Sequence, residues 1–516
     1  MFFRFADKKK LCLILIGLCF LVYANSFKGA FVSDDIPAII NNPSITNPAN
    51  YLFEPASLLS SLTYFLVKED PFLYHLTSVI LHSINTILAF LFLGLFFKTE
   101  TALLGAALFA VHPIHVEAVT WISGRGYLVT ALFTFSVYLL YRYAAYSEKI
   151  SQRASTRYYL FCLLLFSYFI VNEFSFYSLT PLLLILSDVT FGRWRKNWKL
   201  WLPFLGIVAL RLTMAKNLLF GRIDSVARDL SCGITWTNPI FNLAYSFFSH
   251  LILVIWPAKL TLYHEPAVIS SFTLALELVI LTIFVLALPF LYRKAKPIFF
   301  ALGIFVIYLA PTYSPVLISW LVAERYAYIP SVALSICLCF AYDKYVTKSE
   351  PRRNLALAFF IVIITIYSMR TVLRNEDWKT PERLWKATLK VSPLSPRAHN
   401  NMGDVYSREG NMEAAVLEFR KAIELNPNYA DACHNLANSY YSQGKLKEAI
   451  HYYQKAIASN PALFESHYNL GIVYINIGDF DKATEELNKA ARLKPSDRYV
   501  RSALEFSMKN RVAPNN

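Results

Sequence analysis

The sequence predicts an all-α protein in two parts, a polytopic bundle of about 11 membrane helices followed by an α-solenoid of short repeats. Hydrophobic residues make up 56% of the 516 residues and charged residues only 16%, against about 25% charged in soluble domains. Apolar runs near the ~20 residues that cross a bilayer recur up to about residue 374. We therefore expect a multi-span membrane domain over 1–374 and a different fold beyond it.

The C-terminal part shows a strict period of 34 residues, carried by four equally spaced prolines, Pro393, Pro427, Pro461 and Pro495. Three glycines, Gly410, Gly444 and Gly478, keep the same step. This period is typical of tetratricopeptide repeats, in which each unit contributes two helices. We expect a linker at 375–392, three repeats plus a capping helix over 393–510, and a tail at 511–516. Such a solenoid offers a surface for protein partners.

The basic residues predict the topology of the membrane part. The first apolar run, 11–23, follows Arg4 and Lys8 to Lys10, and cytoplasmic flanks collect Lys and Arg. The run lacks a small-residue cleavage site and is interpreted as an uncleaved anchor. An odd number of crossings then places every basic loop in the cytoplasm and the repeats outside. The apolar stretch 239–256 is expected as a re-entrant or interfacial helix, because a full crossing would invert the later loops.

The charge and the cysteines exclude other classes. The formal net charge of +15 lies largely in short loops between apolar runs, so it is a topology signal and no nucleic acid is expected as a partner. The seven cysteines show no metal-ligand spacing and no disulfide framework.

Polar residues from distant parts of the chain fall at the predicted outer ends of spans, which favours a functional site there. The candidates are Asp34, Asp35, His112, His115, Glu117, Arg125, Glu173, Glu324 and Arg325. Two adjacent acids at a membrane face are costly unless they do chemistry or bind a cation. The alternative for Asp34 and Asp35 is an inert, solvated helix end.

The other candidates also allow two interpretations. His112, His115 and Glu117 could hold a metal ion, but Pro113 disturbs the helical register, so they could equally bind a phosphate or brace a loop. Arg125 suits an acid or a lipid phosphate because of its forked donors. Structural ion pairing explains Glu324 and Arg325 as well as phosphate capture does.

These motifs form one ordered series: an Asp-Asp loop, HPIHVEAV with an SGR continuation, WPAKL, AERYAYIP, RNEDW and the C-terminal repeats. Over essentially its whole length the chain resembles the transmembrane and tetratricopeptide repeat proteins of the GT-C glycosyltransferase class, as a bacterial-type member. Animal members are protein O-mannosyltransferases of the endoplasmic reticulum. The resemblance implies a GT-C-like bundle, a polyprenyl-phosphate-linked sugar as donor, a catalytic aspartate in the first external loop, and transfer on the non-cytoplasmic side.

The chain departs from this pattern at two positions. Tyr127 stands where relatives commonly carry an acid, and Asn172 stands where they often carry a lysine. The repeat array is also short. The first two departures affect a charge-pairing or phosphate-binding contact.

The implied chemistry assigns roles to the candidates. Asp34 or Asp35 takes the proton of an acceptor hydroxyl as an oxocarbenium-like transition state forms. Arg125, Arg325 and the two histidines are available to the departing phosphate. A divalent metal, Mg²⁺ or Mn²⁺, can supply the same charge, although the sequence does not demand one.

The expected function is transfer of mannose or another hexose to a protein Ser or Thr that the repeats recruit. One alternative acceptor is an envelope glycan or lipid. A second alternative is a non-catalytic membrane scaffold. The expected location is a bacterial inner membrane with the repeats in the periplasm, or the endoplasmic reticulum with the repeats in its lumen.

Overall fold

The computed structural model describes residues 5–52, 54–147, 151–170, 177–214, 239–265, 271–313, 320–346 and 349–511. Throughout these ranges the regular elements are helices, which confirms the all-α fold class. The chain forms two compact units, and the boundary between them lies between Leu384 and Trp385. We call them the membrane unit and the repeat unit.

The membrane unit contains the polytopic bundle. Among the described residues, six helical stretches are long and apolar enough to cross a bilayer: Lys8–Lys28, Pro71–Leu93, Ile122–Tyr146, Phe272–Lys294, Lys296–Tyr313 and Glu350–Asp377. The pair Thr99–Ala110 and Pro113–Thr120 passes the same test together, with a bend of 48°, and makes a seventh crossing if it is one span. The count lies below the 11 or so expected, because other apolar helices are shorter or more polar.

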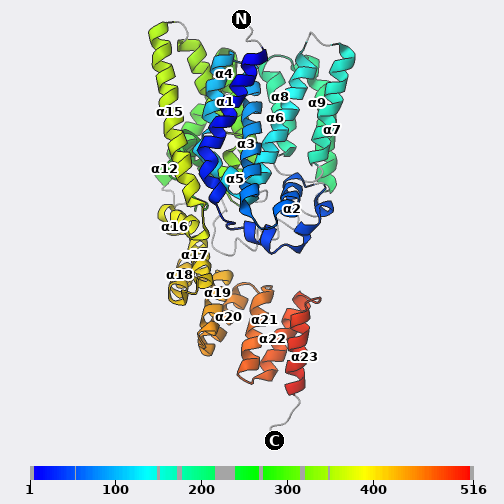
Figure 1. Ribbon diagram of the computed structural model, residues 1–516, viewed down its shortest axis with the longest axis vertical. Helices are drawn as coiled ribbons and strands as arrows, with labels where there is room; N and C mark the ends of the chain where they lie inside the picture. The colour runs from blue at the N-terminus through cyan, green and yellow to red at the C-terminus, as the bar shows by residue number, and fades with distance from the viewer. Residues whose placement is uncertain are drawn as a thin grey trace. The chain divides into compact units, whose positions relative to one another are not determined.

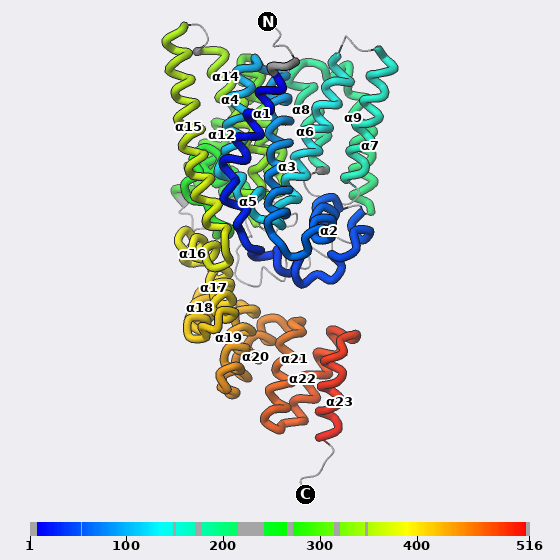
Figure 2. Tube along the Cα trace, in the orientation of Figure 1, coloured from blue at the N-terminus to red at the C-terminus, as the bar shows by residue number. Residues whose placement is uncertain are grey.

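The long helices of the bundle are α1 (Phe5–Tyr23), α3 (Pro71–Leu93), α6 (Arg125–Tyr146), α12 (Ser271–Lys294), α13 (Lys296–Leu309) and α15 (Glu350–Asp377). The others are α2 (Pro55–Val67), α4 (Thr99–Ala110), α5 (Val116–Thr120), α7 (Gln152–Ile170), α8 (Thr180–Thr190), α9 (Trp194–Met214), α11 (Pro239–Ile255) and α14 (Val332–Ala341). Figure 1 shows α1, α3 and α4 side by side, and Figure 2 shows that α15 returns beside α1 from a distant part of the sequence.

Short turns at one end of this bundle, here called the site end, carry or closely flank most of the candidate residues. They are η1 (Ala24–Lys28), η2 (Ile36–Ile40), η5 (Pro113–His115), η6 (Ile122–Gly124) and η9 (Glu324–Ala327). Pro113 cannot continue the helical hydrogen-bond ladder, and the bend follows there. The expected interfacial helix corresponds to α11, a predominantly apolar helix of 17 residues; its depth in the membrane stays a prediction.

A buried histidine on α3 ties these turns to the bundle. His82 Nε2 donates to the Ala110 carbonyl at 2.9 Å, so its Nδ1 accepts from the Tyr328 hydroxyl at 2.6 Å. The residue is fully buried. It therefore fixes the chain after η9 against the bend between α4 and η5.

The repeat unit consists of paired helices, and it confirms the expected solenoid. Its pairs are α17 (Pro396–Arg408) with α18 (Met412–Leu425), α19 (Ala430–Ser442) with α20 (Leu446–Ser459), and α21 (Phe464–Asn476) with α22 (Phe480–Leu493), followed by α23 (Arg498–Arg511). A further helix, α16 (Pro381–Val391), precedes them. Gly410, Gly444 and Gly478 have φ of +81°, +72° and +76°, the left-handed conformation that ends a helix and favours glycine.

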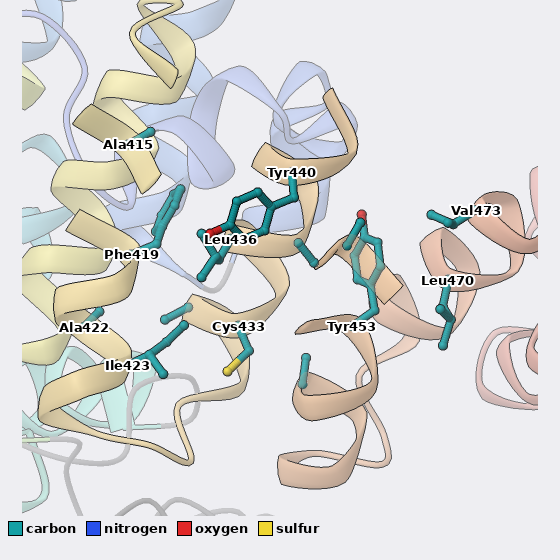
Figure 3. Close-up of a cluster of buried hydrophobic side chains, with 14 of the residues drawn as sticks. Ala415, Phe419, Ala422, Ile423, Cys433, Leu436, Tyr440, Tyr453, Leu470 and Val473 are labelled. Carbon is teal, nitrogen blue, oxygen red and sulfur yellow. The ribbon is translucent and has the colours of Figure 1, made fainter. Parts of the chain in front are cut away.

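Small buried residues let neighbouring helices of the solenoid approach each other. Ala415, Ala449 and Ala483 are fully buried at the repeat interval. In Figure 3 the Phe419 ring of α18 points toward Leu436 of α19, and both belong to one continuous apolar cluster. Each repeat thus buries its apolar face only by stacking on the next.

A histidine bridges the two helices of the first repeat. His399 Nδ1 lies 2.6 Å from Glu418 Oε2, and its Nε2 donates to the Pro393 carbonyl at 3.0 Å. Burial by itself would lower the pKa of His399, but these two partners together raise it above its usual value. The second repeat has Cys433 at the equivalent position. The fold therefore favours the imidazolium in the first repeat.

Replacing His399 should destabilise the first repeat in a pH-dependent way. Because the pKa is raised in the folded state, its stabilisation is fully present below about pH 6.5 and is lost as the pH rises through the folded value. We expect His399→Gln to reduce the local unfolding free energy of α17 and α18 by about 1 kcal/mol at pH 6 and by less at pH 8. Amide hydrogen exchange of the full-length protein measures it. The exposed His451→Gln serves as control, and an equal loss at both pH values would contradict the assignment.

Candidate active site

Asp35 is a buried brace that ties the first loop to η6. Its Oδ1 accepts from the Ser123 backbone N–H at 2.7 Å and from the Ser123 hydroxyl at 2.6 Å. Its Oδ2 accepts from the Val32 N–H at 3.1 Å. Burial raises the pKa of Asp35 to about 6, although these hydrogen bonds and Arg125 oppose the shift. Both oxygens are therefore already engaged by protein donors.

Asp34 is the exposed member of the acid pair. Neighbouring protein atoms displace water from around Asp34, and this desolvation raises the pKa of its carboxyl. The positive charge of Arg325 and a hydrogen bond with Ser33 oppose the shift. Ser33 itself has a φ of +52°, a conformation that costs a non-glycine residue on the order of 1–3 kcal/mol and that clusters at functional sites. The two aspartates thus differ sharply in surroundings although they are adjacent in sequence.

Arg325 and Glu117 form a buried ion pair. Glu117 Oε1 accepts from Arg325 Nη1, and Glu117 Oε2 accepts from the Arg325 backbone N–H at 2.8 Å. The guanidinium also lies 5.0 Å from the centre of the Tyr326 ring and 5.5 Å from that of Trp121. A small pocket beside it is lined by Tyr127, Thr130, Tyr308, Arg325, Tyr326, Tyr328, Ile329 and Pro330. The structure therefore brings Asp34, Arg325 and Glu117 into one electrostatic group.

Glu324 is paired with an arginine that the sequence analysis did not single out. Its Oε1 accepts from Arg374 Nη2 at 3.1 Å, and Arg374 Nη1 donates to Asp377 at 3.0 Å. Both Glu324 and Arg374 are fully buried. Arg374 opens the RNEDW motif at the end of an apolar run, and a charged residue in that position is the signal that could have identified it.

The two histidines lie in the packed interior of the site end. His112 Nε2 donates to the Val254 carbonyl at 2.8 Å, and its Nδ1 accepts from the Ile114 N–H at 3.2 Å. His115 Nε2 pairs with the Ser331 hydroxyl at 2.8 Å. Among the described residues, no group of three or more His, Cys, Asp or Glu side chains could hold a metal ion.

Arg125 holds helices together within the bundle. It donates to Ser78 at 3.1 Å, to Ser60 at 3.3 Å and to Thr77 at 2.9 Å, and also to the Tyr74 carbonyl. Only 1% of the residue is exposed. Its guanidinium thus joins α6 to α2 and α3. Glu173, the remaining candidate, lies outside the described residues, as does Asn172.

Fold and site define a polytopic membrane protein with a tetratricopeptide solenoid and buried ion pairs at one end of its bundle. A family profile described as "TPR repeat" matches residues 403–444 and 437–478, and one described as "Tetratricopeptide repeat" matches 464–497. Among solved structures, "Crystal structure of MamA protein" shares 26% identity and covers 25% of this chain and 72% of that one, with a TM-score of 0.24.

Curated relatives match most of the chain. "Protein O-mannosyl-transferase TMTC3" of Homo sapiens is 25% identical over 484 residues, which cover 80% of this chain and 51% of the relative. "Protein O-mannosyl-transferase F38B6.6" of Caenorhabditis elegans is 24% identical and covers 81% and 63%, and human "Protein O-mannosyl-transferase TMTC4" is 25% identical and covers 78% and 65%. The expected resemblance to transmembrane and tetratricopeptide repeat O-mannosyltransferases is confirmed. The chain spans about half to two thirds of these relatives' length.

The two aspartates should respond differently to the loss of their charge. In Asp35→Asn the new amide group faces the Val32 N–H, so a buried donor loses its acceptor and the folded state loses about 1–3 kcal/mol. Asp34→Asn should change stability by no more than about 0.5 kcal/mol, as surface substitutions usually do. Thermal unfolding of the purified protein in detergent measures both. A larger loss in Asp34→Asn than in Asp35→Asn would contradict the assignment of Asp35 as the brace.

Proposed function

We propose that the protein transfers a sugar, mannose or another hexose, from a polyprenyl-phosphate donor to a hydroxyl of a protein Ser or Thr. The observation that carries the proposal is the exposed Asp34 carboxylate, which follows the strained Ser33 and interacts electrostatically with Arg325. It occurs in a chain whose curated relatives are named protein O-mannosyl-transferases. Transfer on the non-cytoplasmic face, where the topology expected from the sequence puts the site end, completes the proposal.

Asp34 is the general base in this proposal. Its exposed carboxylate can reach an acceptor hydroxyl, whereas the Asp35 oxygens already accept three protein hydrogen bonds. The raised pKa of Asp34 makes its ionised form a stronger base. Asp35 contributes by holding the loop, and through it the strained Ser33, in place.

The reaction is a single displacement. The acceptor oxygen attacks the anomeric carbon of the donor, the bond from that carbon to the phosphate oxygen breaks, and the acceptor proton passes to Asp34. One displacement inverts the anomeric centre. Because the lipid phosphate leaves with the bonding electron pair, the protein must supply a base on one side and positive charge on the other.

Arg325 supplies the positive charge for the departing phosphate. Glu117 engages one guanidinium nitrogen and the backbone N–H of Arg325, which fixes the side chain without using all of its donors. The Trp121 and Tyr326 rings beside the guanidinium exclude water, and electrostatic interactions strengthen where water is excluded. Arg325 is thus oriented before the donor binds.

The repeat unit recruits the acceptor protein in this proposal. Stacked tetratricopeptide repeats present an extended surface suited to peptide segments, and the chain has three such pairs of helices with a further helix, α23. The membrane unit holds the lipid of the donor in the bilayer. A bacterial inner membrane with the repeat unit in the periplasm is the proposed location.

Loss of the Asp34 carboxylate should abolish catalysis and spare binding. We expect Asp34→Asn to lower kcat for sugar transfer about 10²–10⁴-fold with little change in donor affinity, because a general base acts on the acceptor in the transition state. Membranes that contain the variant would be supplied with radiolabelled polyprenyl-phosphate mannose, then glucose, and the protein and glycan fractions counted. Asp34→Glu should restore part of the rate.

The exposed Glu54→Gln, which removes an acid from the same loop region, is the matched control and should transfer at the wild-type rate. Equal counts for wild type and Asp34→Asn with each donor would overturn the catalytic role of Asp34. Label confined to the glycan fraction would change the acceptor from protein to glycan.

A further inference from the structure

Three buried polar atoms at the site end lack a hydrogen-bond partner among the protein groups of the described structure. They are Glu324 Oε2, His264 Nε2 and Arg374 Nε. Folded proteins rarely leave a buried carboxylate oxygen unpaired, because it has lost its hydration without compensation. Three such atoms on neighbouring side chains indicate that this place receives a polar group from elsewhere.

The geometry around Glu324 shows how these side chains converge. Arg374 Nη2 donates to Glu324 Oε1 at 3.1 Å, and His264 Nε2 lies 3.8 Å from the same oxygen. The second distance is too long for a hydrogen bond. Glu324 and Arg374 are fully buried, whereas the His264 side chain keeps 13% of its surface exposed. His264 is therefore the only one of the three side chains that reaches the surface of the described structure.

The three side chains are held by rigid surroundings. Arg370, one turn before Arg374 on α15, donates to the Pro257 carbonyl at 3.4 Å and to the Ala258 carbonyl at 3.2 Å. Next to His264, the Tyr263 ring stacks on Trp320 with 4.7 Å between centroids. One face of α15 thus positions both Glu324 and the segment that leads to His264.

The cluster adjoins the residue proposed to hold the donor phosphate. Glu324 directly precedes Arg325 in η9, and Glu117, which pairs with Arg325, also interacts electrostatically with Glu324. In a glycosyl phosphate the anomeric carbon is bonded to a phosphate oxygen, so the ring hydroxyls lie within a few ångströms of the phosphate. A donor bound at Arg325 therefore places its sugar near this cluster.

The charges select the kind of group that fits. The Arg374 guanidinium repels a metal cation from Glu324, and the Glu324 carboxylate repels a second phosphate. A neutral hydroxyl is repelled by neither group. It can donate a hydrogen bond to Glu324 Oε2 and accept one from Arg374 or His264. Sites built to bind a substrate hydroxyl strongly reject analogues that lack it.

We propose that Glu324, His264 and Arg374 form a subsite that binds a hydroxyl of the donor sugar and selects among hexoses. The proposal rests on the proposed function in taking the ligand to be a lipid-linked sugar. Asp34 acts on the acceptor hydroxyl, whereas this subsite recognises the sugar of the donor.

Binding of deoxy analogues tests the subsite directly. The full-length protein in detergent would be titrated with a short-chain prenyl-phosphate mannose and with analogues that each lack one ring hydroxyl, at positions 2, 3, 4 or 6. We expect one analogue to bind the wild type at least tenfold more weakly than the parent. In Glu324→Gln and in His264→Ala the parent should bind about as weakly as that analogue, so the difference between the two ligands disappears.

His264→Ala keeps the Glu324–Arg374 pair, so it remains informative if Glu324→Gln folds poorly. Glu376→Gln is the matched control on α15: Glu376 pairs with Lys379 and Arg383, and its loss should leave the discrimination at the wild-type value. Equal binding of all analogues by the wild type, or discrimination that persists in both variants, would overturn the subsite and leave a structural cluster that holds water.

The transfer assay separates this proposal from the proposed function. Transfer by the wild type without discrimination among analogues overturns the subsite alone. Discrimination in binding without transfer from any donor overturns the proposed function alone and leaves the subsite intact. No binding of any analogue overturns the subsite as stated.

Discussion

Two buried ion pairs, Glu117 with Arg325 and Glu324 with Arg374, hold the geometry of the site end. Removing one partner of such a pair leaves an uncompensated buried charge and costs about 3–5 kcal/mol. The partners come from α5, η9 and α15, which are far apart in sequence. The two residues of each pair meet only when these elements are packed together. The need to pair the buried charges therefore specifies how α15 packs against the rest of the bundle.

Neutral hydrogen bonds complete this closure. Asn375 on α15 donates to the Val22 carbonyl at 3.0 Å, and the Thr120 hydroxyl donates to Asn375 at 2.8 Å. The Ala30 N–H donates to the Lys379 carbonyl at 2.9 Å. The loop that carries Asp34 and Asp35 is thus anchored at one end to the turn that follows α15 and, through Ser123, to η6. A long loop would lose considerable entropy on being ordered, and these contacts offset that cost.

The sequence predicted much of the fold because its signals were local. Apolar runs and the proline period act within one helix or one repeat, so composition and spacing suffice to identify them. The number of crossings stays a prediction. Six helical stretches among the described residues, or seven with the bent pair, are long and apolar enough to cross a bilayer, whereas apolar helices such as α8 are too short to do so alone. Hydropathy identifies an apolar run but does not report the length of the helix that it forms.

The candidate site was predicted only in part, for the same reason. From the sequence alone, Asp34 and Asp35 were equally good candidates for the catalytic base. Only their contacts in the structure distinguish the exposed Asp34 from the buried Asp35. Arg125 and Arg325 both follow small or acidic residues near span ends, yet Arg125 joins three helices and Arg325 interacts electrostatically with Asp34. Nothing in the sequence pointed to His264. It became a candidate only because its unpaired Nε2 lies near Glu324, which is 60 positions away in the chain.

The tyrosine at position 127 fits this arrangement of charge. The resemblance leads one to expect an acid there, but Tyr127 lies beside Arg325, hydrogen-bonds to it and packs its ring 5.8 Å from that of Tyr326. A second carboxylate would neutralise the guanidinium that Glu117 already pairs with. A phenol positions the same guanidinium by hydrogen bonding and leaves its charge in place. If Arg325 binds the donor phosphate as proposed, a neutral partner at position 127 preserves its attraction for the donor.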